Sequence, residues 1–196
     1  MKNFNRLFII IILSLLFISI TSLAAADESY FLIDDFSSGE STLGTEWEEF
    51  TDQVMGGESE MSLQKMSDDG EYIRMQGKVS LEKNGGFIQT RIKLSSRFSS
   101  FNGSSYKGIR ILARGIGSGY YIFLRTSATL LPWKYFSASV QLEKDWTYID
   151  IPWSAFAADE TSSKENIKVN KLKSIAIAAY GKEFNASIDV KEIGLY

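Results

Sequence analysis

Acidic side chains gather near the start of the chain and are the first candidates for chemistry. Two carboxyl groups held ~5–9.5 Å apart across a glycosidic bond can hydrolyse it, so Glu48 and Asp52 are candidate catalytic acids. Acids at strand ends are also common as solvated surface groups, and the sequence leaves both interpretations open. The acidic clusters of this region are Asp34-Asp35 and the group Glu46, Glu48, Glu49 and Asp52.

A calcium site is a second use for carboxylates. Calcium takes six to eight oxygen ligands, and Asp34 or Asp35 with Asp189 or Glu192 would supply some of them while joining the first and last strands. Exposed acids at strand ends are the simpler explanation. We therefore expect no metal centre and no cofactor.

The chain contains no histidine and no cysteine. This composition removes the commonest general base, the thiol nucleophile and the usual zinc ligands. A Ser-His-Asp hydrolase is excluded. We expect a protein that is not an enzyme.

Aromatic side chains are the better indication of binding. Trp133, Tyr135, Trp146, Tyr148 and Trp153 lie within a short stretch. Sugar rings stack on such planes while polar groups fix their orientation, although Trp146 and Tyr148 alternate into a core equally well. We select Trp133, Tyr135 and Trp153 as candidate binding residues.

Two glycine-paired turns organise the first half of the chain. They are Asp52-Gln53-Val54-Met55-Gly56-Gly57-Glu58-Ser59 and Asn84-Gly85-Gly86-Phe87-Ile88-Gln89-Thr90-Arg91. Adjacent glycines suit a backbone with positive φ or one pressed against a neighbour. Either the two turns form a structural corner with an Asp52–Arg91 ion pair, or they form a recognition loop. For the second case the candidate partner-binding residues are Asp52, Gly56, Gly57, Ser59 and Arg91.

These turns carry a family resemblance. Trp47, the run Asp52 to Ser59, Gly86-Phe87 and Arg91 resemble the complex I intermediate-associated protein 30 family, over roughly residues 30–196. The resemblance implies a galactose-binding-like β jelly roll and a role in assembling respiratory complex I. The opening run 33–39 also looks like the start of some carbohydrate-binding jelly rolls.

Apolar and polar residues alternate in short segments separated by turn residues, as in an antiparallel sandwich or jelly roll. No long amphipathic helix is predicted, and 172–180 has the length and composition of a central strand. The fold class is therefore all-β. The predicted strands are 30–36, 47–51, 61–66, 72–79, 87–94, 106–113, 120–126, 133–141, 146–151, 172–180 and 186–196.

Residues 1–26 are predicted to be a secretory signal, and 27–196 a single domain. The apolar run from Leu7 to Ile20, about 14 residues long, is shorter than the ~20 that a spanning helix needs. We expect export to the periplasm or extracellular space, with no transmembrane span after cleavage. Loss of Lys2 and Arg6 changes the net charge from −3 to −5, which disfavours nucleic acid as a partner.

Three functions remain. The family resemblance implies a non-enzymatic assembly-factor domain that binds protein clients, such as unfolded or partly assembled chains. The aromatic residues favour a carbohydrate-binding module of the cell envelope. The acidic cluster allows a hydrolase that uses Glu48 or Asp52.

Overall fold

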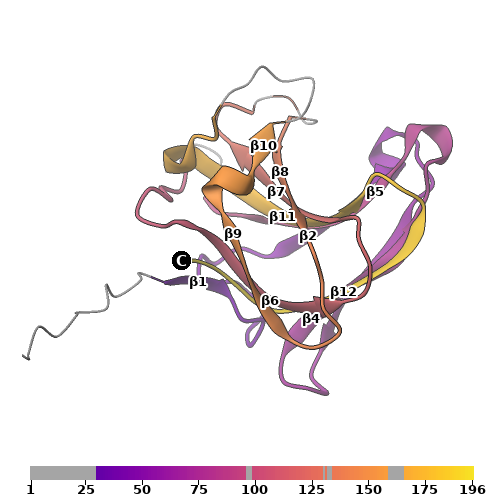
Figure 1. Cartoon of the computed structure of the whole chain (residues 1–196), viewed down its shortest axis with the longest axis horizontal. Helices are drawn as coiled ribbons and strands as arrows, with labels where there is room; N and C mark the ends of the chain where they lie inside the picture. The colour runs from indigo at the N-terminus through magenta and orange to yellow at the C-terminus, as the bar shows by residue number, and fades with distance from the viewer. Residues whose placement is uncertain (1–29, 96–98, 130, 132–133, 159–165) are drawn as a thin grey trace, which may run out of the picture.

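The computed structural model describes residues 30–95, 99–129, 131, 134–158 and 166–196. Two antiparallel sheets of six strands each pack face to face (Figure 1). The predicted signal at 1–26 and the candidate Trp133 lie outside the described residues. In the part that is described, no helix has the length and apolar character needed to cross a membrane.

Sheet A joins the two ends of the domain. Its strand order is β3-β4-β12-β6-β9, with β1 paired to the end of β12. Its strands are β1 (Phe31–Asp34), β3 (Glu60–Met66), β4 (Tyr72–Val79), β6 (Gly108–Gly115), β9 (Thr147–Pro152) and β12 (Phe184–Leu195).

Sheet B forms the second layer, in the order β10-β8-β7-β11-β5-β2. Its ribbon bends away from sheet A, so the outer face of sheet B is concave (Figure 1). Its strands are β2 (Trp47–Thr51), β5 (Phe87–Lys93), β7 (Tyr120–Thr126), β8 (Phe136–Val140), β10 (Ala157–Ala158) and β11 (Leu172–Tyr180).

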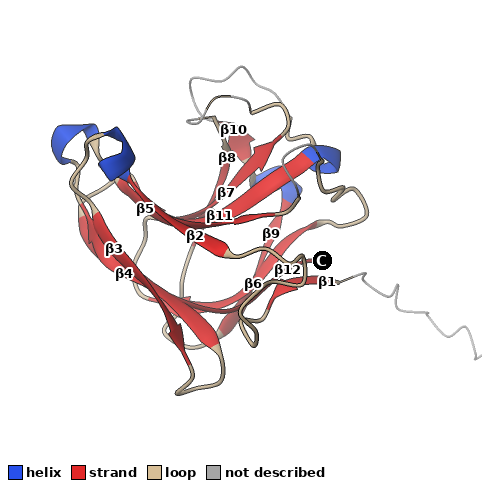
Figure 2. Ribbon diagram, turned by 180° about the vertical axis from the view of Figure 1, so that it is seen from behind, coloured by secondary structure: helices blue, strands red, loops and turns tan. Residues whose placement is uncertain are grey.

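In the part of the chain that the structure describes, four short 3-10 helices connect the strands. Two of them, η1 and η2, stand at one end of the sandwich beside β5 (Figure 2). The four are η1 (Asp52–Met55), η2 (Glu82–Asn84), η3 (Trp153–Ala155) and η4 (Val169–Lys171).

The predicted fold class is confirmed: the chain is an antiparallel jelly roll of short strands. The predicted central strand at 172–180 is β11, which lies between β7 and β5. Its inward side chains are apolar, and its outward ones are also buried at Ala176 and Ala178, so the strand is apolar on both faces. The segment that follows Pro152 forms the short helix η3.

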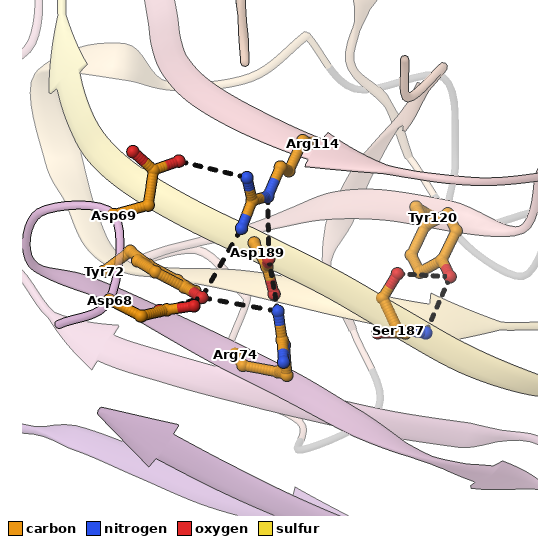
Figure 3. Close-up of polar contacts among 8 residues, drawn as sticks. All are labelled: Asp68, Asp69, Tyr72, Arg74, Arg114, Tyr120, Ser187 and Asp189. Carbon is orange, nitrogen blue, oxygen red and sulfur yellow. Dashed lines mark hydrogen bonds and ion pairs between the residues drawn. The ribbon is translucent and has the colours of Figure 1, made fainter. Parts of the chain in front are cut away.

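Two polar side chains tie the layers together through the core. The Tyr120 hydroxyl of sheet B accepts a hydrogen bond from Ser187 N (2.9 Å) and donates to Ser187 O (3.1 Å) in sheet A (Figure 3). Trp47 Nε1 of β2 donates to Asp34 Oδ2 of β1 at 2.9 Å. Both residues thereby bury aromatic rings while keeping their polar atoms paired.

Candidate functional site

The carboxylate of Asp52 organises the corner at which η1 and η2 meet. Asp52 is fully buried and accepts hydrogen bonds from Ser59 N (2.9 Å), Gly86 N (2.6 Å) and Phe87 N (3.3 Å), as well as from Ser59 Oγ. Ser59 Oγ in turn accepts from Ser80 N at 2.9 Å. One side chain therefore fixes two loops that are about thirty residues apart in the sequence.

The glycines of this corner make room for that carboxylate. A Cβ at Gly57 would collide with the Asp52 carboxyl, and one at Gly85 would lie 2.5 Å from Asp52 Oδ2. Gly56 has φ +90°, the left-handed conformation that ends η1. The paired glycines are thus explained by close approach and turn geometry.

The electrostatics of the corner favour the ionised form of Asp52. Burial raises the pKa of this carboxyl, but the hydrogen bonds from Ser59, Gly86 and Phe87 outweigh burial and hold the pKa below its usual value. The predicted ion pair between Asp52 and Arg91 is wrong, because Arg91 Nη2 instead binds Glu48 Oε2 at 3.0 Å.

Asp52 and Ser59 are fully buried, so a partner cannot reach their side chains. The structure shows them as supports of the loop. Three large apolar side chains are exposed at the corner: Val54 (71%) and Met55 (62%) in η1, and Leu81 (48%) beside η2. The corner also exposes polar groups, among them the ion pair between Lys83 and Glu58. We call Val54, Met55 and Leu81 the apolar tip.

The strand register places the outward side chains of sheet B in rows. One row runs Glu48, Arg91, Ala176, Phe123, Ser137 across five strands, and the next runs Phe50, Gln89, Ala178, Tyr121, Ser139. The flanking rows are Phe87–Tyr180 and Lys93–Ser174–Arg125. Small residues on the central strand thus lie between longer side chains on both sides.

Four aromatic rings form a cluster on this outer face. Phe123 stacks on Tyr135 at 4.2 Å between ring centroids, and Tyr180 meets Phe123 (5.7 Å) and Tyr121 (6.0 Å) edge-on. The cluster packs over Ala176 and Ala178. Tyr180 remains 40% exposed. We call these four rings the aromatic cluster.

Polar side chains border the cluster. The Arg91 guanidinium lies 4.1 Å from the centre of the Phe50 ring and binds Glu48, which Lys93 also contacts. The hydrogen bond from Lys93, assisted by Arg91, lowers the pKa of Glu48. Within the described residues, the buried Arg91 Nε–H has no acceptor.

Arg125 stands on the other side of the central strand. Its Nη2 donates to the carbonyl oxygens of Thr129 (3.0 Å) and Leu131 (2.9 Å). Burial lowers the pKa of Arg125, and the positive charge of Arg91 lowers it further. The two arginines flank β11 from opposite sides, Arg91 opposite Ala176 and Arg125 opposite Ser174.

The aromatic residues singled out in the sequence do not share one region. Tyr135 belongs to the aromatic cluster, but Trp153 donates from Nε1 to Tyr106 O (2.7 Å) and packs against the core. Trp146 and Tyr148 lie on the outer face of sheet A, where they contact Asp69 and Glu192. The expectation of a single aromatic region is wrong because β9 pairs with β6 in sheet A, whereas β8 pairs with β7 in sheet B.

A second polar centre lies on sheet A, around Asp189 (Figure 3). Arg74 binds both oxygens of this buried carboxylate (2.7 and 2.8 Å), and Arg114 Nε binds Oδ2 (2.9 Å). Burial raises the pKa of Asp189, but the arginines outweigh it and lower the pKa. Asp189 is thus neutralised by arginine, and no three carboxylates of the described residues gather as a metal site.

Sheet A also carries a shallow hollow of about 450 Å³ between β3, β4 and β12. None of its nine lining residues is aromatic. It lacks the ring planes on which a sugar stacks, whereas sheet B presents them.

Sequence reasoning missed Tyr121, Phe123 and Tyr180. The signal was the alternation within 120–126, which places Tyr121, Phe123 and Arg125 on one face opposite Ile122 and Leu124. Both faces contain apolar residues, so the pattern alone does not say which is outward.

These features define a galactose-binding-like β sandwich with an aromatic outer face on sheet B. The family model of complex I intermediate-associated protein 30 matches residues 35–189, and the chain belongs to this family. No curated protein matches the chain.

Solved structures with the same architecture include carbohydrate-binding modules. A family 11 module from Clostridium thermocellum, in complex with a β-1,3-1,4-mixed-linked tetrasaccharide, is 16% identical with a TM-score of 0.64, covering 85% of this chain and 94% of that one. The family 11 module of the cellulosomal cellulase Lic26A-Cel5E from the same organism is 15% identical with a TM-score of 0.66 and the same coverage. At these identities the likeness concerns the fold.

Proposed function

We propose that this chain is a non-enzymatic binding domain that takes a glycan on the outer face of sheet B. The observation that carries the proposal is the aromatic cluster, in which Phe123 is buried beneath Tyr135 while Tyr180 is 40% exposed and Tyr121 and Tyr135 are half-buried. Aromatic planes bind the apolar faces of sugar rings, and Gln89, Arg91 and Arg125 border the cluster with donors that can orient hydroxyl groups.

The structure offers no support for a hydrolase that uses Glu48 or Asp52. A general acid at neutral pH needs a raised pKa, but the pKa values of both carboxyls are lowered. Asp52 is enclosed and Glu48 is paired with two cations. A binding role without turnover is the simpler function.

Substitution of cluster residues tests the glycan proposal. Tyr121→Ala and Tyr180→Ala should each weaken binding to a matching oligosaccharide about tenfold, since one stacked ring contributes ~1 kcal/mol or more. Tyr148→Ala is the control, because Tyr148 is an exposed tyrosine on sheet A. Calorimetric titration against a panel of soluble glycans measures the effect. Equal loss in all three variants, or in none, contradicts the proposal.

A protein client is the second candidate, and the apolar tip favours it. Val54, Met55 and Leu81 expose apolar side chains on loops that Asp52 holds in place. Exposed apolar side chains on a loop of fixed backbone suit protein contact. Membership of the complex I intermediate-associated protein 30 family is compatible with a client that is itself being assembled.

Two variants distinguish the glycan-binding function from the client-binding function. The assay is cross-linking of the protein in envelope extract, with capture of one defined client protein as its readout. Substitution of Val54, Met55 and Leu81 together by Ser should abolish this capture, whereas Tyr180→Ala should retain it. If the tip variant keeps the client, or if both variants lose it, the tip is not the client surface.

Export is part of the proposal. A cell-envelope location would place the domain where glycans are available, and it depends on cleavage near Ala26. Amino-terminal sequencing of the secreted protein measures it. A mature chain that still begins at Met1 would contradict cleavage.

A further inference from the structure

The outer face of sheet B carries more positive than negative charge. Its outward strand positions hold Arg91, Lys93 and Arg125, and in the described strands the only acid among them is Glu48. Glu48 serves both Arg91 and Lys93. The formal excess at this site is opposite in sign to the net charge of −3 for the whole chain.

Among Arg91, Lys93 and Arg125, Arg125 has the least compensation of its charge by carboxylates. Its contacts are to backbone carbonyls of Thr129 and Leu131, and no carboxylate of the described residues binds it. Ser174 lies directly opposite both Lys93 and Arg125, is nearly buried and adds a hydroxyl. The row Lys93–Ser174–Arg125 thus places a cation on either side of a buried serine.

The rows that contain aromatic residues and the rows that contain cations follow one another along the length of the same strands. Outward residues two apart on a strand are separated by ~6.6 Å, so the row of Phe87 and Tyr180 lies ~20 Å from the row of Lys93 and Arg125. An extended oligomer can contact both ends. The Arg91 guanidinium lies 4.1 Å from the centre of the Phe50 ring, and its Nη2 binds Glu48. A ligand carboxylate at Arg91 would therefore share this guanidinium with Glu48.

We propose that the glycan bound by sheet B is acidic: a saccharide whose carboxylate groups bind Arg125 and Arg91 while its rings lie on the aromatic cluster. This inference rests on the proposed glycan function and specifies the ligand class. The carboxylate would receive charged donors from both sides of β11, with Ser174 between them.

Calorimetric titration with two hexasaccharides of equal length tests the inference. The probes are an oligogalacturonate, which carries a carboxylate on each ring, and a neutral cello-oligosaccharide. We expect the acidic probe to bind at least tenfold more tightly, with an affinity that falls as salt increases. Arg125→Met and Arg91→Gln should each remove about ten- to a hundredfold of that preference.

The control is Arg110→Gln. Arg110 is an arginine of sheet A that pairs with an exposed aspartate, Asp150, and contacts an aromatic ring, as Arg91 does. It should leave both affinities unchanged. Because Arg125 also holds the backbone at Thr129, Arg91→Gln and Lys93→Gln keep the test valid if Arg125→Met unfolds, and thermal unfolding monitors this.

The outcomes distinguish the two proposals. If neutral and acidic probes bind equally well and Tyr180→Ala weakens both, the acidic inference is overturned while the glycan function stands. If neither probe binds and a wider glycan panel also fails, both are overturned. Equal losses from Arg110→Gln and Arg91→Gln would show unspecific charge attraction and also overturn the inference.

Discussion

At the scale of single residues, Asp52 explains the most distinctive stretch of the sequence. Its carboxylate receives donors from Ser59, Gly86 and Phe87, and three of the four donors are backbone N–H groups. Every residue except proline has a backbone N–H group, so such donors cannot be recognised from residue types in the sequence. The sequence therefore predicted a corner built on glycines, while the partner of Asp52 could be assigned only from the structure.

Asp52→Asn should destabilise the domain by about 2–4 kcal/mol, because an amide nitrogen would face buried N–H donors that then lack an acceptor. The measurement is the free energy of unfolding in urea. Asp35→Asn is the matched control, since Asp35 is exposed and bonds only to Ser37 in the described structure; we expect a loss below about 1 kcal/mol. Similar losses in both variants would contradict the structural role of Asp52.

The same residue predicts a pH dependence. The folded pKa of Asp52 is lowered, so its stabilisation is complete above the unfolded pKa of ~3.9 and is lost as pH falls through the lower folded value. The difference in unfolding free energy between wild type and Asp52→Asn should be constant above about pH 5 and shrink below about pH 4. A difference that instead grows with acid contradicts the lowered pKa.

Gly57→Ala tests the close approach at the corner. A Cβ there would collide with Asp52, so we expect a loss of about 1–3 kcal/mol in unfolding free energy. Gly39→Ala is the control, because no atom lies within 4 Å of its added Cβ. That variant should be neutral or slightly stabilising. If Gly57→Ala leaves the unfolding free energy unchanged, the corner shifts to accept the added Cβ, which would contradict the close approach.

At the scale of elements, β12 is the strand that binds sheet A together. It pairs with β4, β6 and β1, and Asp189 on β12 receives Arg74 from β4 and Arg114 from β6. Arg114 also lies 4.4 Å from the centre of the Trp146 ring. Ion pairs and the contact between Arg114 and the Trp146 ring therefore link neighbouring strands on the outer face of sheet A.

Removal of this centre should be costly. Asp189→Asn leaves two partly buried arginines short of a counter-charge, and we expect a loss of about 3 kcal/mol or more. Asp150→Asn breaks an exposed pair with Arg110 and should cost less than about 1 kcal/mol. Thermal or urea unfolding of both variants measures the contrast, and equal costs would contradict the central place of Asp189.

The alternation of apolar and polar residues predicted where the strands lie, but it did not predict which face of each strand points outward. The alternation in 120–126 and the apolar run 172–180 correctly indicated β7 and β11. It could not show that Tyr121, Phe123 and Tyr180 point away from the sandwich, because Ala176 and Ala178 make both faces of β11 apolar. Which face is outward depends on strand pairing, a property of distant segments.

At the scale of the whole molecule, the two outer faces differ in character. Sheet A presents polar networks that satisfy themselves, around Asp189 and between Arg110 and Asp150. The outer face of sheet B is concave (Figure 1). It carries the aromatic cluster beside Arg91 and Arg125. The fold and family were predictable from the sequence, whereas this difference required the pairing of β7, β8 and β11.

The most direct measurement is an NMR titration, in which an oligosaccharide that binds is added to the isotope-labelled protein. Changes in the amide and aromatic chemical shifts report the residues that it contacts. The account predicts that shifts concentrate on the outward residues of β5, β7 and β11, with Gln89, Tyr121 and Tyr180 among the largest. Shifts centred on the outer face of sheet A, around Trp146 and Tyr148, would contradict it.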